Sequence, residues 1–127
     1  SLPMELPQAV GLVIQALVFR LDSSLPLTGK EGLPFEGFDV CPADGGEPYR
    51  IGLEPDLTRA SYDYDHRLCL VAWVKLPDTR FRLERLMFTG TRAEALDTLV
   101  TPAFRDELRI AFHELLAKCR EERRKSC

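Results

Sequence analysis

The chain contains few of the residues from which catalytic and metal sites are usually built. Its 127 residues include two histidines and four cysteines, and no two cysteines form a C-x-x-C pair. Zinc sites are usually built from closely spaced ligand pairs. No nucleophile elbow or phosphate-binding loop is present either. We therefore expect no enzymatic activity, no bound cofactor and no metal site.

Long apolar runs and a surplus of one charge are also missing. No apolar run approaches the roughly 20 residues that cross a bilayer, which argues against a membrane protein. The 20 acidic and 17 basic residues are well mixed and give a net charge of −3. Such a chain has no strong field to attract nucleic acid or anionic lipid, so neither is expected as a partner. Scattered cysteines inside apolar patterns suit reduced thiols in the cytoplasm, with the nucleus as a second compartment.

The richest part of the sequence consists of two apolar segments, LCLVAWVKL and FRLERLMF, separated only by the residues PDTR at 77–80. This pattern predicts a β-hairpin. The strand Leu68–Leu76 is apolar on both faces, which indicates a central strand covered on each side. In the second strand the alternation reverses after Arg85, which predicts a β-bulge near Glu84 and Arg85.

Two helices are expected at the ends of the chain. Apolar residues recur at helical spacing from Pro7 to Leu21. This helix has almost no charge before Arg20, so we expect most of its surface to be covered. A second, longer helix begins at Thr101-Pro102, where a capping residue precedes a first-turn proline. Its basic end, at 120–127, is expected to fray.

The remaining segments are shorter. Residues 22–48 are rich in proline and glycine and predict a long irregular connection, with a short strand at 35–41. Clean alternation predicts a half-exposed strand at Tyr49–Leu53, and Ala93–Val100 predicts a short helical turn. The whole chain, 1–127, is thus expected to form a single globular α+β domain, an antiparallel sheet with the N- and C-terminal helices packed on one face.

Two surfaces are candidates for binding a partner. If helices cover one side of the sheet only, Cys69, Val71 and Trp73 form an exposed apolar stripe, and such stripes mark partner sites. Arg82, in a local basic stripe on the second hairpin strand, is a further candidate that could meet an acidic partner. The alternative is that the proline-rich connection folds over this stripe. Arg105 and Arg109 mark a second candidate surface on the flank of the last helix. In both cases the expected partner is a second copy or a related domain.

A third hypothesis places chemistry in the segment SYDYDH, where Asp63, Asp65 and His66 could bind a divalent cation or act as an acid/base set. A solvated turn before a strand is the simpler interpretation, because D-x-D alone lacks the glycine and glutamate of a calcium loop. A different class of protein, a small acidic secretion chaperone that binds an extended partner segment, also fits short helices around a sheet.

Four segments follow one another in the chain: PQAVGLVIQALVFRL, PYRIGLEPD, LCLVAWVKLPDTRFRLERLMF and FRDELRIAFHELLAKCRE. Their order and character resemble the FP domain, which is shared by a proteasome-inhibitor regulator and an F-box subunit of ubiquitin ligases. The chain lacks the family's tryptophan ahead of the first strand and its acidic segment before the last helix. The resemblance implies a non-catalytic α/β domain that forms homodimers or heterodimers with other FP domains through a helical face or a sheet surface. It also implies a link between ubiquitin ligases and proteasome regulation.

Overall fold

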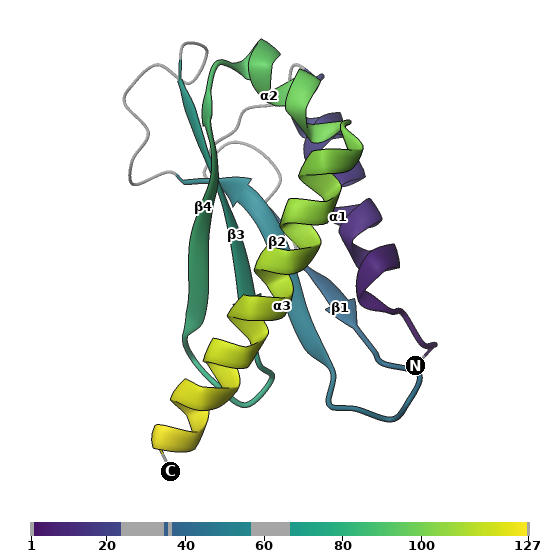
Figure 1. Ribbon diagram of the computed structural model, residues 1–127, viewed down its shortest axis with the longest axis vertical. Coiled ribbons are helices and arrows are strands. Elements are labelled where there is room, and N and C mark those ends of the chain that lie inside the picture. Colours follow the sequence, from purple (N-terminus) through teal and green to yellow (C-terminus); the bar gives the residue numbers. More distant parts are fainter. Residues whose placement is uncertain (1, 24–34, 36, 57–66, 127) are drawn as a thin grey trace.

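The computed structural model describes residues 2–23, 35, 37–56 and 67–126 (Figure 1). Helices lie at both ends of the chain and the strands lie between them. Within these residues the elements are α1 (Leu6–Leu21), β1 (Phe38–Val40), β2 (Tyr49–Pro55), β3 (Leu68–Lys75), β4 (Arg82–Gly90), α2 (Arg92–Leu99) and α3 (Pro102–Lys125).

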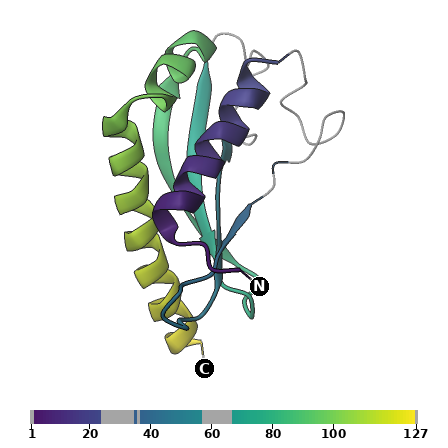
Figure 2. The ribbon, with the colours of Figure 1, turned by 90° about the vertical axis from the view of Figure 1, so that its right-hand side faces the viewer.

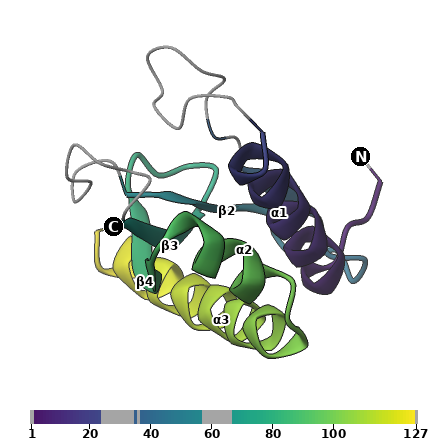
Figure 3. The same cartoon turned by 90° about the horizontal axis from the view of Figure 1, so that it is seen from above.

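The strands form one antiparallel sheet in the order β1-β2-β3-β4. All three helices lie on the same side of it, with α3 crossing β3 and β4 and α1 lying over β1 and β2 (Figures 1 and 2). Seen from above, α2 closes one end of the helical layer between α1 and α3 (Figure 3). The predicted α+β architecture, with the terminal helices on one face, is therefore confirmed.

The core lies between the helical layer and the sheet. Alternate residues of β3, namely Leu70, Ala72 and Val74, face the helices and are fully buried. Opposite them, α3 buries one helical face, which includes Phe104, Leu108, Phe112, Leu115 and Cys119. The strand with two apolar faces thus lies inside the sheet between β2 and β4, as the sequence predicts.

The hairpin contains a bulge, but not where we expected it. Leu70 pairs with Phe88 while Val71 pairs with Leu86, so Met87 is the extra residue of β4. The bulge returns Phe88 to the core side after Leu86 has pointed to the other face, because one inserted residue reverses the side-chain parity. The predicted position near Glu84 and Arg85 was wrong, since both are still in regular register with β3.

Helix α3 begins as the sequence indicates and ends later. The Thr101 hydroxyl accepts a hydrogen bond from the Phe104 backbone N–H at 3.2 Å, and Pro102 is the first helical residue. The helix continues through Lys125, beyond the point at Arg120 where we expected fraying. Arg123 holds this end by donating to Glu47 at 2.6 Å and to Asp78 at 3.1 Å. In the described part of the chain, no helix has the length and apolar character needed to cross a membrane.

Candidate functional site

The outer face of the sheet does not present the exposed apolar stripe that the sequence suggested. Trp73 is 5% exposed and Val71 is 4% exposed. The indole packs against the backbone at two glycines, Gly52 and Gly37. A Cβ atom on Gly52 would lie 2.2 Å from Trp73 Cε2, and one on Gly37 would lie 2.5 Å from Trp73 Cη2. The ring therefore lies across glycines of the neighbouring strand and of the segment before β1.

Arg82 covers the same ring. Its Cζ atom lies 4.8 Å from the centre of a Trp73 ring, within the range of a cation–π contact. The guanidinium is held in place by Glu54 on β2, at 2.5 Å, and by Glu84 on β4, at 2.9 Å. The prediction that Val71 and Trp73 are exposed was wrong: both side chains are buried, and glycines and a paired arginine cover the Trp73 ring within one chain. Arg82 belongs to this cover.

The hypothetical metal or acid/base set cannot be placed, because Asp63, Asp65 and His66 lie outside the described residues. Among the residues that are described, no group of three or more histidine, cysteine, aspartate or glutamate side chains could hold a metal ion. Cys119 lies in the core, where burial raises the pKa of its thiol. A thiol of this kind stays protonated and is a poor nucleophile.

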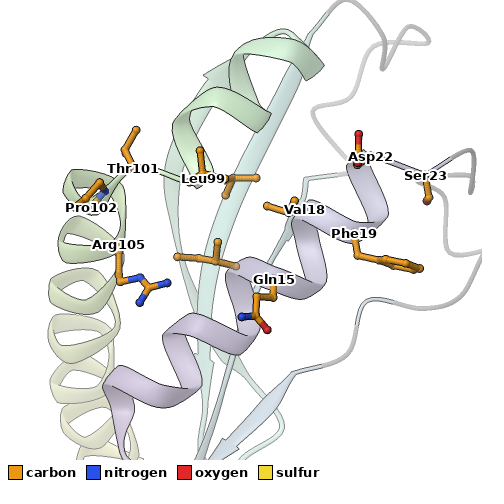
Figure 4. Close-up of a pocket in the computed structure, with 11 residues that line it drawn as sticks. Gln15, Val18, Phe19, Asp22, Ser23, Leu99, Thr101, Pro102 and Arg105 are labelled. Atoms are coloured by element: carbon orange, nitrogen blue, oxygen red, sulfur yellow. The ribbon is translucent and has the colours of Figure 1, made fainter.

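A cleft of about 710 Å³ opens on the helical side, between α1 and the corner where α2 meets α3 (Figure 4). Its walls are mostly apolar. They comprise Ile14, Val18, Phe19, Leu99, Val100 and Pro102, with Gln15, Asp22, Ser23, Thr101 and Arg105 as polar neighbours. A second cleft of about 500 Å³ lies on the other side of α1, toward β1 and β2, and Phe19 and Gln15 line both.

The local sequence explains why this surface is open. Helix α1 packs on the sheet through Val10, Val13 and Leu17. Its outward face, one turn after another, is formed by Leu12, Gln15, Ala16 and Phe19, all exposed and all uncharged. The solvated face of a surface helix normally carries charged residues. Helix α1 therefore presents to water a face of the composition that proteins usually cover.

The corner between α2 and α3 contributes the opposite wall. Leu99 ends α2 and is buried, whereas Val100 is the single residue before the Thr101 cap and is 69% exposed. Because the cap fixes where α3 starts, Val100 cannot turn into the core with Leu99. Phe19, across the cleft on α1, is 66% exposed. These are two of the most exposed large apolar side chains in the described residues.

Charges stand at the two ends of the cleft. Arg105 projects from the first turns of α3 toward α1, and Asp22 lies at the far end, where α1 stops (Figure 4). Neither side chain forms an ion pair within the described part of the chain. Arg109 is exposed one turn further along α3 and does not line the cleft. Of the five predicted partner-binding residues, only Arg105 belongs to this site.

The predicted partner-binding residues did not include Phe19 or Leu12, although the sequence contained a signal for both. Phe19 and Leu12 are apolar but lie off the buried face of α1, and the absence of charge before Arg20 extends over both faces. From that absence we expected most of the helix surface to be covered. Within the described residues only one face of α1 is covered, so the same pattern marks an open apolar surface.

No protein-family model, curated protein or solved structure matches the chain.

Proposed function

We propose that the chain is a non-catalytic protein–protein interaction domain, and that it binds its partner on the outward face of α1 and the cleft beside it. The observation that carries the proposal is the uncharged exposed face of α1, formed by Leu12, Gln15, Ala16 and Phe19. This face stands between two apolar clefts. Contiguous exposed apolar surface of this kind marks interaction sites.

The composition of the surface fits binding rather than catalysis. Interaction sites are centred on an aromatic or aliphatic anchor that becomes fully covered, with polar residues at the rim. Phe19 and Val100 supply exposed anchors, and Asp22 and Arg105 supply the rim. The anchors lie on or directly beside helices whose packing fixes them, so little ordering is required when a partner binds.

The resemblance to the FP domain family supports the same class of function. It implies homodimers or heterodimers with a related domain and a role between ubiquitin ligases and proteasome regulation, in the cytoplasm and nucleus. The helical face is one of the surfaces that the resemblance names, and it is the surface on which the open cleft lies. We include these partners and compartments in the proposal.

The test compares proteins captured from cell extract by the wild-type chain and by two variants, Ala16→Glu and Phe19→Glu. Each variant places a charge on the outward face of α1. We therefore expect the amount of captured partner protein, measured by quantitative mass spectrometry, to fall at least tenfold for both variants. Ala117→Glu and Ile110→Glu are matched controls, because both residues are exposed on α3 away from the cleft. A set of captured proteins that is unchanged in the α1 variants would refute the proposal.

A further inference from the structure

We infer that the outer edge of β4 is a separate docking site, which takes a short extended segment of another protein and adds it to the sheet as a further strand. β4 ends the sheet, and within the described residues it pairs with β3 alone (Figure 1). In an antiparallel ladder, alternate residues of an edge strand point their N–H and C=O groups away from the neighbouring strand. The chemical complement of such a row of peptide groups is another extended backbone.

The opposite edge of the sheet is less suitable. Strand β1 has only 3 residues, Phe38–Val40. Directly after it, the chain before α1 pairs with this edge, because the N–H groups of Met4 and Cys41 each donate to the carbonyl of the other residue at 2.9 Å. Strand β4 has 9 residues, and its register with β3 is regular from Arg82 to Leu86. The longer of the two edges is therefore the one that stays open.

The arginines of β4 do not guard its edge. Edge strands are often protected from pairing by charged side chains. In β4, however, Arg82 lies over Trp73 of β3 and reaches Glu54 of β2 at 2.5 Å, so it leans inward across the sheet. Arg85 reaches Glu114 of α3 at 2.6 Å. Both guanidinium groups are thus held away from the outward peptide groups of the strand.

A groove of about 640 Å³ lies beside this edge, on the helical side, between the start of β4 and the last turns of α3. Phe81 and Leu83 supply its apolar wall, and no described residue of β3 lines it, so it opens outside the last strand. Side chains of an added strand alternate between the two faces of the sheet. Every second side chain of the segment would therefore enter the groove, and the others would lie near Leu86, which is 44% exposed on the opposite face.

Charge in the groove adds a preference for an acidic residue. Glu121 and Glu122 of α3 line the groove but pair with Arg124 and Lys125 of the same helix. Lys118 also lines it and forms no ion pair within the described residues. A carboxylate that enters beside Lys118 would meet a free cation. The occupant is therefore an extended segment with apolar residues and an acidic residue on the side that faces α3.

N-methylation of a bound peptide tests the backbone contact. Linear peptides are selected on the purified chain from a displayed random library, and those that also bind the Phe19→Glu chain are kept, because this variant removes the α1 face. Methylation of alternate amides of the peptide should raise its Kd at least about tenfold, and methylation of the amides between them should leave it within about twofold. Absence of any such peptide, or a loss of binding without this alternation, refutes the inference.

The protein side of the contact is tested with the same peptide. Hydrogen exchange followed by NMR should slow at least about tenfold on binding for alternate backbone amides from Arg82 to Leu86. Lys118→Glu should raise the Kd of the peptide at least about fivefold. Arg109→Glu is the matched control, since it makes the same change of charge at an exposed position of α3 outside the groove. It should leave the Kd within about twofold. Protection confined to other strands, or equal losses in the two variants, refutes the inference.

A second copy that pairs through β4 is the competing occupant. It would give a dimer by light scattering and slow exchange of the same β4 amides with no peptide present, and this result also refutes the inference. The test is independent of the proposed function. If Ala16→Glu abolishes capture of partners while no peptide binds at β4, the edge site is refuted and the α1 site stands. If a peptide binds at β4 while capture is unaffected by Ala16→Glu, the edge site is supported and the α1 site is refuted.

Discussion

At the scale of single residues, the contact between Trp73 and Gly52 decides which face of the protein is open. A large aromatic ring on the outer face of a sheet would normally mark a partner site. Here the directly opposite residue on β2 is glycine, and the ring occupies the space that a side chain would fill. The indole Nε1 has no hydrogen-bond partner within the described residues, so packing and the contact with Arg82 hold the ring.

Gly52→Ala should therefore destabilise the protein by about 1–3 kcal/mol, the usual cost of overpacking. The new Cβ atom would lie 2.2 Å from Trp73 Cε2, so the ring must move. In a Trp73→Leu background the same substitution should cost less than about 1 kcal/mol, because the smaller side chain leaves room. Urea denaturation of the four proteins of this cycle measures both values. Equal costs in the two backgrounds would show that the ring is not the obstacle.

At the scale of elements, the sequence predicts well which residues share a face of a helix or strand, but predicts poorly what covers that face. The alternation in Leu68–Leu76 correctly indicated a strand buried on both faces, and the Thr101-Pro102 pair correctly indicated the start of α3. The exposure of Trp73 was mispredicted because its cover comes from other strands, whose register the pattern of one strand does not contain. Phe19 was missed for the converse reason. An uncharged helix face predicts that something covers it but not whether the cover belongs to the same chain.

Helix α2 offers an element whose stability depends on pH. The Glu94 carboxylate accepts a hydrogen bond from the Thr91 backbone N–H at 2.9 Å, and the Thr91 hydroxyl accepts one from the Glu94 N–H at 3.1 Å. The bonds from Thr91 to the carboxylate lower the pKa of Glu94 below its usual 4.5. A carboxyl group whose pKa is lowered by folding stabilises the folded state above its unfolded pKa, and this contribution disappears as the pH falls through the folded pKa.

Glu94→Gln should therefore lower the thermal midpoint at pH 7, and the difference from wild type should shrink as the pH falls from about 4.5 to below the folded pKa. Thermal unfolding followed by circular dichroism at pH 7, 5, 4 and 3 checks this. Glu107→Gln serves as the control, since the Glu107 side chain is exposed on α3 and makes no hydrogen bond to another described residue. A difference that stays constant over this pH range would contradict the proposed cap.

At the scale of the whole molecule, Arg123 joins three regions that are far apart in the sequence. It links the last turn of α3 to Glu47, in the connection between β1 and β2, and to Asp78, in the turn between β3 and β4. The open end of the two-layer structure, away from α2, is thus closed by one guanidinium group. Composition alone predicted a solvated tail here, because a run of mixed charges at a helix end says nothing about acidic loops that the fold brings to it.

Arg123→Gln should loosen this end of the molecule without unfolding it. We expect amide hydrogen exchange to become several-fold faster in the last turn of α3 and near Glu47, and to stay unchanged in the middle of α3. Arg124→Gln is the matched control, because Arg124 pairs with Glu121 of its own helix at 2.5 Å. Equal exchange in both variants would mean that Arg123 does not hold the loops.

The burial of Trp73 has one practical consequence. It is the only tryptophan in the chain, and it lies on the face of the sheet opposite the helical cleft. Its fluorescence should therefore respond to the loss of native structure and be silent to events on α1. The molecule thus carries a built-in optical reporter that separates misfolding from altered recognition in every variant of the cleft.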